Sequence, residues 1–250
     1  MQLVRILIAA LIAGISLQGM AACEVKSGPS IAALVELYTS EGCSSCPPAD
    51  RQLGQLRQGK GTTVVPLALH VGYWDDLGWR DPFAQDAFAR RQSWLVQLGG
   101  RSTVYTPQFF VAGTDVRPAA VDERIREVNA EPPQASILLK VRSQGGDALA
   151  ISASARSTVE AAALYVAVAE NGLSSQVRAG ENGGRRLRHD HVVRAWIGPL
   201  SLHGGSLELQ RSVPLAKTWQ SARLEVSAFV QDQHTGRVLQ AVGAGQCAGA

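Results

Sequence analysis

Several residue types and patterns are scarce or missing in this chain, and each absence weakens the case for a class of protein. Methionine occurs only at positions 1 and 20, so the chain has no cluster of the soft thioether ligands that favour copper(I). The catalytic patterns GxSxG and HExxH and the phosphate-binding P-loop do not occur. The sequence therefore gives no support for a hydrolase of these types or for a P-loop enzyme.

Charge of one sign is also scarce. The formal net charge is +3, and no long polybasic run occurs. The densest basic stretch is GGRRLRHDHVVR, residues 183–194, which Asp190 interrupts. This composition gives no case for nucleic-acid binding. We interpret the stretch as an exposed turn and strand face, with contact to an acidic partner surface as the alternative.

Only one long apolar run is present, and it lies at the N-terminus. Arg5 precedes an apolar core of residues 6–17, and small residues follow at Ala21 and Ala22. This layout is typical of a secretory signal peptide, which we predict over residues 1–22. No later segment has about 20 apolar residues, so we expect no membrane span and a periplasmic or secreted protein. A lipid anchor on Cys23 is the less favoured alternative, because leucine usually occupies the third position before a lipidated cysteine.

Cysteine is rare, with four residues at positions 23, 43, 46 and 247. An even number of cysteines in an oxidising compartment suggests disulfide pairing. Cys43 and Cys46 are neighbours, which leaves Cys23 and Cys247. Domain termini often lie close together, so we predict a structural disulfide between Cys23 and Cys247.

The remaining chain divides into two halves with different hydrophobic periods. Residues 31–130 alternate short apolar runs with helical patterns, such as Ala49, Leu53 and Leu56 at i, i+4 and i+7. After Pro133 apolar and polar residues alternate in about seven short segments, separated by Gly-, Ser- and Asn-rich turns. We therefore predict an α/β domain over residues 23–132, followed by an all-β antiparallel sandwich-like domain over residues 133–250.

The pattern CSSC follows the first predicted strand and begins the first predicted helix. Cys43 would precede the helix, where free backbone N–H groups and the helix dipole stabilise a thiolate. Cys46 would lie in the first turn and could attack a mixed disulfide formed on Cys43. Pro47 and Pro48 suit this turn, where a missing N–H group costs nothing. This arrangement indicates a thiol redox site.

Other residues have candidate roles beside this pair. Thr106-Pro107 precedes the third predicted strand, where thioredoxin-like proteins have a cis-proline that faces the cysteine pair and the substrate. Glu36, in the first strand, is a candidate proton acceptor for Cys46; the alternative is an exposed position at a strand edge. The aromatic residues after the second strand are candidates for a substrate-binding wall, or simply close the core: Tyr73, Trp74 and Trp79.

Three segments together resemble the secreted bacterial thioredoxin-like family known as domain of unknown function family 1223. They are LVELYTSEGCSSCPPAD, LALHVGYWDDLGWRDPF and RSTVYTPQFFVAG, and the basic stretch RAGENGGRRLRHDHVVR also resembles that family. The resemblance implies a thioredoxin-like fold with a β-rich extension. It supports Cys43 and Cys46 as the redox pair and Pro107 as the cis-proline, but it implies no function.

Other chemistry for the cysteine pair is less favoured. Structural zinc needs four ligands, and the chain has one CxxC, with His189 and His191 placed in the other half, so we predict no metal site and no cofactor. Copper(I) bound by the pair with His70 or another soft ligand, and a purely structural disulfide, remain alternatives.

The predicted function is thiol–disulfide exchange on protein substrates by an exported oxidoreductase. Glu41 lies two residues before Cys43, and its charge would disfavour the thiolate. This favours a reductase or isomerase that a redox partner keeps reduced. The alternative is a non-enzymatic periplasmic binding or copper-handling protein, in which the CxxC pair is structural or binds metal.

Overall fold

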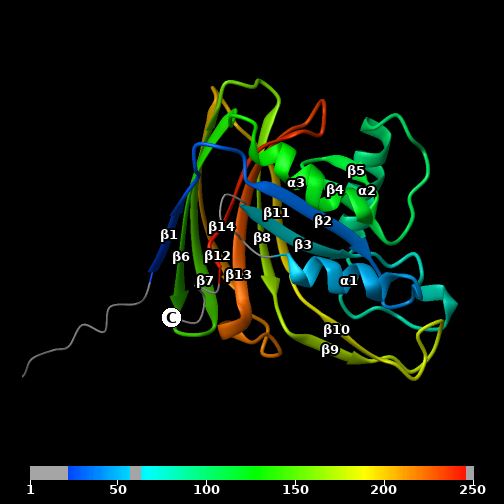
Figure 1. Cartoon of the computed structure of the whole chain (residues 1–250). Coiled ribbons are helices and arrows are strands. Elements are labelled where there is room, and N and C mark those ends of the chain that lie inside the picture. The colour runs from blue at the N-terminus through cyan, green and yellow to red at the C-terminus, as the bar shows by residue number, and fades with distance from the viewer. Residues whose placement is uncertain (1–21, 57–62, 246–250) are drawn as a thin grey trace, which may run out of the picture.

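The structure is a computed structural model that describes residues 22–56 and 63–245 (Figure 1). The predicted signal peptide, except its last residue, and Cys247 lie outside the described residues. Within the described ranges, no helix combines the length and apolar character needed to cross a bilayer.

A mixed eight-stranded sheet forms the centre of the molecule, with β11, β3 and β2 parallel to one another and the other neighbours antiparallel. In spatial order its strands are β14 (Val238–Gly243), β13 (Leu224–Asp232), β8 (Ala162–Glu170), β11 (Val192–Ser201), β3 (Val64–His70), β2 (Ala33–Thr39), β4 (Gln108–Val111) and β5 (Thr114–Val116).

Two further sheets are antiparallel. The four-stranded sheet has the order β1 (Ala22–Lys26), β6 (Ala135–Gln144), β7 (Ala148–Ser157) and β12 (Ser206–Pro214). A separate hairpin is formed by β9 (Leu173–Gln176) and β10 (Arg186–His189). In Figure 1 this hairpin extends beneath α1, away from the four-stranded sheet.

The α-helices of the described chain belong to its first half. The α-helices are α1 (Cys46–Gln55), α2 (Asp86–Leu98) and α3 (Val121–Asn129). Short 3-10 helices occur at η1 (Asp75–Leu77), η2 (Pro118–Ala120) and η3 (Ser221–Arg223). Ala49 and Leu53 are buried on α1, as expected from their spacing, and Pro47 occupies its first turn.

Strand β8 separates two hydrophobic cores. Its side chains alternate between the two faces of the sheet, and every residue from Ala162 to Glu170 is buried. Ala163 and Tyr165 belong to the core shared with the helices, whereas Leu164 and Val166 pack against the four-stranded sheet. The central strands are therefore covered on both faces.

The predicted fold class, an α/β thioredoxin-like domain followed by a separate all-β sandwich, is wrong. The described residues are mostly β, with 45% strand and 19% helix, and the large sheet contains strands from both halves. The physical reason is that β11 returns to lie parallel to β3, with Val192 opposite Ala68. The predicted boundary near residue 132 falls in the connection between α3 and β6, yet the two sides share this sheet.

Candidate functional site

Cys43 and Cys46 form a disulfide at the start of α1. Their Cα atoms are 5.4 Å apart, a normal separation for a disulfide, and the Cys46 N–H donates to the Cys43 carbonyl at 3.2 Å. Ser44 and Ser45, between them, are exposed. The cysteines themselves are buried, with exposed fractions of 1% and 0%.

The loop between β9 and β10, residues 177–185, lies against the disulfide. The Asn182 side-chain amide donates to the carbonyls of Glu41 and Cys43, both at 2.9 Å. Glu181 accepts a hydrogen bond from the Ser44 N–H at 2.9 Å, which lowers the pKa of the Glu181 carboxyl. We call residues 177–185 the covering loop, because they hold the cysteine segment from the other half of the chain.

Polar side chains are buried beside the disulfide. Asp50 lies one helical turn after Cys46 on α1 and accepts a hydrogen bond from the Thr39 hydroxyl at 2.7 Å. His189 lies between Glu41 and Asp50. Its Nε2 is 3.0 Å from the Glu41 carboxylate, and its Nδ1 is 3.8 Å from the Asp50 carboxylate.

A second histidine–carboxylate pair adjoins the first. His70 Nδ1 lies 2.7 Å from Asp81, and the same Asp81 oxygen accepts the Glu41 N–H at 2.8 Å. The rings of His70 and His189 meet edge to face, with centroids 5.0 Å apart. His70 Nε2 and His189 Nδ1 are buried and have no hydrogen-bond partner. We call Glu41, Asp50, His70, Asp81 and His189 the buried acid–histidine cluster.

Burial and charge shift the pKa values in this cluster. Burial raises the pKa of Asp50, although His189 and His70 partly oppose it. Burial alone would lower the pKa of His70, but the charge and hydrogen bond of Asp81 outweigh it, so the pKa is raised. Burial would raise the pKa of Asp81, but His70 and two backbone N–H groups lower it overall. Asp50 therefore holds a proton more readily than an ordinary aspartate.

Glu36 is engaged elsewhere. Its carboxylate accepts two hydrogen bonds from Arg91 of α2, at 2.6 and 3.0 Å, and one from Tyr38 at 3.3 Å. Strand alternation explains this, because Thr39 faces Asp50 of α1 and Glu36 therefore faces the opposite side of β2. The proton-acceptor role predicted for Glu36 gains no support from these contacts, and Asp50 is better placed for it.

The Thr106-Pro107 peptide bond is cis. Trp74 connects this segment with the cysteine segment, because its Nε1 donates to the Thr106 hydroxyl at 2.8 Å and its Cβ approaches Gly42. A Cβ atom placed on Gly42 would lie 2.8 Å from that of Trp74, so a larger residue at position 42 would collide with it. The roles predicted for Thr106 and Pro107 in substrate contact stay predictions.

The three aromatic residues make different contacts. The Tyr73 and Trp74 rings lie 6.4 Å apart, and the Trp79 Nε1 donates to Glu41 at 2.8 Å. Tyr73 is 43% exposed. A substrate role for these residues also stays a prediction.

Cys23, in β1, is disulfide-bonded. Its predicted partner, Cys247, lies outside the described residues, so the pairing stays a prediction. Among residues 22–56 and 63–245, no group of three or more His, Cys, Asp or Glu side chains is arranged to hold a metal ion.

Sequence reasoning did not identify several residues of the site, namely Asp50, Asp81, Glu181, Asn182 and His189. Asp50 and Asp81 lie inside two of the quoted segments, and the others lie inside the basic stretch. These polar residues are visible in the sequence beside strongly patterned segments. The sequence does not show, however, that segments more than 130 positions apart come into contact.

The site is thus a disulfide at a helix N-terminus, set in a mixed β-sheet protein and enclosed by polar side chains from both halves of the chain. The family model described as "Protein of unknown function (DUF1223)" matches residues 34–231, so the chain belongs to this family. No curated protein matches it. The crystal structure of protein AGR_C_4864 from Agrobacterium tumefaciens is similar, with 24% sequence identity, a TM-score of 0.61 and coverage of 87% of this chain and 95% of that one. That similarity supports the fold alone.

Proposed function

We propose that Cys43 and Cys46 are a redox-active pair that exchanges disulfides with protein substrates. The observation that carries the proposal is Asp50, a buried carboxyl with a raised pKa one helical turn after Cys46. Groups with shifted pKa values cluster at functional sites, so a buried carboxyl with a raised pKa near the cysteine pair favours a redox role over a bracing one.

The exchange begins from the dithiol form. The Cys43 thiolate attacks one sulfur of a substrate disulfide, which forms a mixed disulfide and releases one substrate thiolate. Cys46 passes its proton to the Asp50 carboxylate, and the Cys46 sulfur then attacks the Cys43 sulfur. The Cys43–Cys46 bond forms and the second substrate thiolate leaves. The substrate disulfide is reduced and the cysteine pair is oxidised, so a dithiol partner must restore it.

We infer that access to the buried cysteines involves displacement of the covering loop, which is hydrogen-bonded to the backbone around Cys43. Asn182 and Glu181 hold the backbone of Glu41, Cys43 and Ser44, and both cysteines are buried in the disulfide form. We infer that a substrate chain replaces these loop contacts when it reaches Cys43.

The second candidate is a bracing disulfide in a non-enzymatic binding protein, which the burial of Cys43 favours. The copper-handling alternative has no supporting observation in the described part of the chain.

The test is the reduction potential of the Cys43–Cys46 couple, measured by equilibration with glutathione and dithiothreitol buffers. Cys46→Ser is used in parallel to trap mixed disulfides on Cys43. A potential of roughly −120 to −270 mV with trapped protein partners supports exchange. A potential below about −300 mV without trapping would make the bond structural.

Asp50→Asn removes the proposed proton acceptor and leaves both cysteines in place. We expect it to slow resolution of a Cys43 mixed disulfide by about 100-fold, the scale of general base catalysis. Asp76→Asn, at an exposed position of η1, is the matched control and should leave the rate unchanged. Equal rates in the two variants would remove Asp50 from the mechanism.

A further inference from the structure

Strand β3 pairs with β2 along its whole length, but on its β11 side it lacks a neighbour along its first residues. It pairs with β11 at Val192 and Ala68, where the Ala68 N–H donates to the His191 carbonyl at 2.8 Å. Because β11 begins at Val192, the preceding residues of β3 have no β11 residue beside them. The Pro66 nitrogen faces the same side as that of Ala68, and it has no hydrogen to donate. Proline cannot donate to a neighbouring strand, and Pro66 accordingly lies where the sheet opens.

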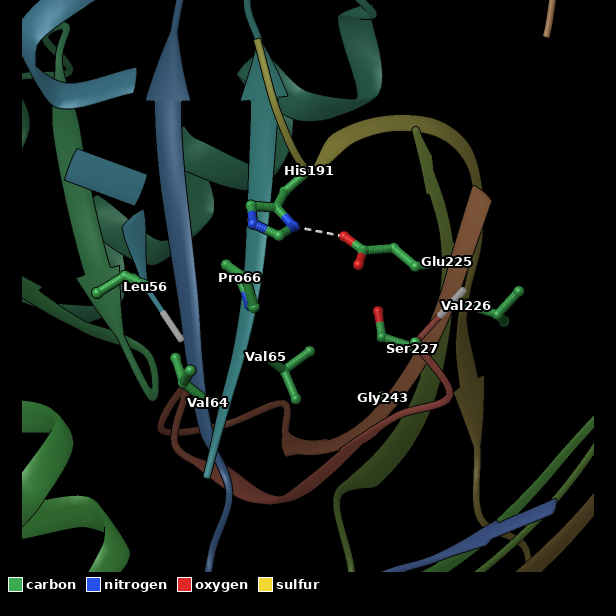
Figure 2. A pocket seen from close by; sticks show the side chains of 10 residues that line it. Leu56, Val64, Val65, Pro66, His191, Glu225, Val226, Ser227 and Gly243 are labelled. Atoms are coloured by element: carbon green, nitrogen blue, oxygen red, sulfur yellow. Dashed lines mark hydrogen bonds and ion pairs between the residues drawn. The ribbon is translucent and has the colours of Figure 1, made fainter. Parts of the chain in front are cut away.

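A cavity of about 180 Å³ occupies this opening. We call it the β3–β13 cavity. Figure 2 shows Val64, Val65 and Pro66 of β3 on one side of it and Glu225 and Ser227 of β13 on the other, with His191 at one end. The lining also includes Leu56, Val226, Gly243 and Gly245.

One side of the cavity is polar and incompletely paired. His191 Nδ1 lies 2.5 Å from Glu225 Oε1, whereas the other carboxylate oxygen makes no hydrogen bond to the described residues. The Ser227 hydroxyl is buried without a hydrogen-bond partner among the described residues, and the residue is only 5% exposed. An unpaired buried hydroxyl is unfavourable and points to a missing ligand group or water. The Glu225 side chain is 20% exposed, so the cavity is reached from solvent.

The backbone at the end of the cavity is also unusual. His191 has a φ of +58°, a left-handed conformation that residues other than glycine rarely adopt. The Asn171 side chain fixes this turn by accepting the His191 N–H at 2.9 Å. Such conformations persist where the surrounding structure holds them, and they cluster at ligand sites.

We propose that the β3–β13 cavity binds a small alkyl amine, with its ammonium group on Glu225 and Ser227 and its alkyl body against β3. Among the described residues, the lining contains the Glu225 carboxylate and His191 but no lysine or arginine, so a cationic head group complements it. A cavity of about 150 Å³ holds benzene, so this volume suits an amine of about six non-hydrogen atoms. This inference does not depend on the redox activity of the cysteine pair.

The test is a titration of the full-length protein with 3-methylbutylamine, followed by backbone amide NMR shifts. The neutral probe 3-methylbutan-1-ol and the anionic probe 3-methylbutanoate have similar bodies. We expect saturable binding of the amine with shifts on β3 and β13, at least tenfold weaker binding of the alcohol, and none of the carboxylate. Equal binding of the three probes, or no saturable binding of the amine, would overturn the proposal.

Two variants locate the head group. Glu225→Gln should weaken amine binding at least tenfold, and Ser227→Ala should weaken it severalfold. Glu208→Gln, at an exposed position of β12, is the control and should bind as the parent does. If Glu225→Gln does not fold, the test rests on the affinity of Ser227→Ala for the amine. Unchanged affinity in whichever of these two variants folds would contradict the proposed site.

Discussion

The two halves of the chain meet in two contrasting ways. At the polar seam, defined here by the contacts Asn182–Cys43, His189–Glu41 and Arg91–Gln231, buried side chains from one half satisfy groups of the other. At the β3–β13 cavity the halves face each other across an opening, and the Ser227 hydroxyl is left without a partner. At the seam the buried Asn182 amide donates to carbonyls of the other half, whereas at the cavity the Ser227 hydroxyl has no such partner among the described residues. The seam is not fully paired either, because His70 Nε2 and His189 Nδ1 also lack a described partner.

The largest effect is expected at Arg91. Its guanidinium pairs with Glu36 and also donates to Gln231 of β13 at 2.9 Å. Arg91→Leu leaves the Glu36 charge buried and unpaired, so we expect a loss of about 3–5 kcal/mol in the free energy of unfolding. Urea denaturation measures this loss.

The double variant Arg91→Leu, Glu36→Leu should recover part of that stability, because an apolar replacement of a buried ion pair is often tolerated. Arg90→Leu, at an exposed position, is the control. A loss below about 1 kcal/mol in Arg91→Leu would show that the pair is hydrated rather than buried.

Asn182→Ala opens the polar seam at the disulfide. It removes two hydrogen bonds from the buried carbonyls of Glu41 and Cys43, so we expect a loss of about 1–3 kcal/mol. The disulfide should also react faster with dithiothreitol, which thiol alkylation measures. Gln97→Ala, at an exposed position of α2, should change neither quantity. An unchanged reduction rate in Asn182→Ala would mean that the covering loop does not limit access.

The His70–Asp81 pair makes stability depend on pH. The pKa of His70 is raised in the folded protein, so its contribution is complete below the unfolded value of about 6.5 and is lost as pH rises through the folded value. The pKa of Asp81 is lowered, so its contribution is present above about 3.9 and is lost as pH falls through the folded value. Together the two residues favour maximum stability between these limits.

His70→Gln should flatten the decline above pH 6.5. The decline amounts to about 1.4 kcal/mol for each tenfold difference in proton affinity between the folded and unfolded chain. His203→Gln, at an exposed position, is the control for histidine loss. Urea denaturation from pH 4 to 9 measures both, and parallel curves for His70→Gln and the parent would contradict the assignment.

Ser227→Ala should have the smallest effect on the free energy of unfolding, and its sign should be opposite to the losses expected for Arg91→Leu and Asn182→Ala. The variant removes a buried hydroxyl that has no partner, so we expect unchanged stability or a gain of up to about 1 kcal/mol. Thermal and urea denaturation detect this difference. A loss above 1 kcal/mol would show that the hydroxyl has a partner, such as a bound water, and would remove the contrast with Asn182.

Local patterns in the sequence predict many elements of this fold. Ala49 and Leu53 place α1 correctly, and the alternation of Ile137, Leu139 and Val141 matches the buried face of β6. Local patterns do not show in the same way which strands pair within one sheet. The run AALYVAVAE of β8 is apolar on both faces, a pattern of a strand covered on both sides, but it does not say what covers it. The parallel contact of β11 with β3 has one register pair and no local signature.

The candidate site was predictable only in part. The cysteine pair has a recognisable spacing, because a CxxC at a helix start is a local pattern. Glu36 was a candidate proton acceptor because it is an acid in an apolar strand, but strand alternation places it on the face of β2 that Arg91 contacts. Asp50 is an acid on a helix, and such a residue is usually solvated. Its burial depends on a contact with His189, which comes from the second half of the chain.

The contact between Cys43 and Asn182 has a consequence in time. The two residues are 139 positions apart, and ribosomes add about 5–20 residues per second. Cys43 therefore exists for roughly 7–28 seconds before Asn182 is made. During this interval the growing chain lacks the amide that later holds the Cys43 carbonyl, so the cysteine segment cannot yet make its final contacts. The order of synthesis therefore makes this segment one of the last parts of the first half to be completed.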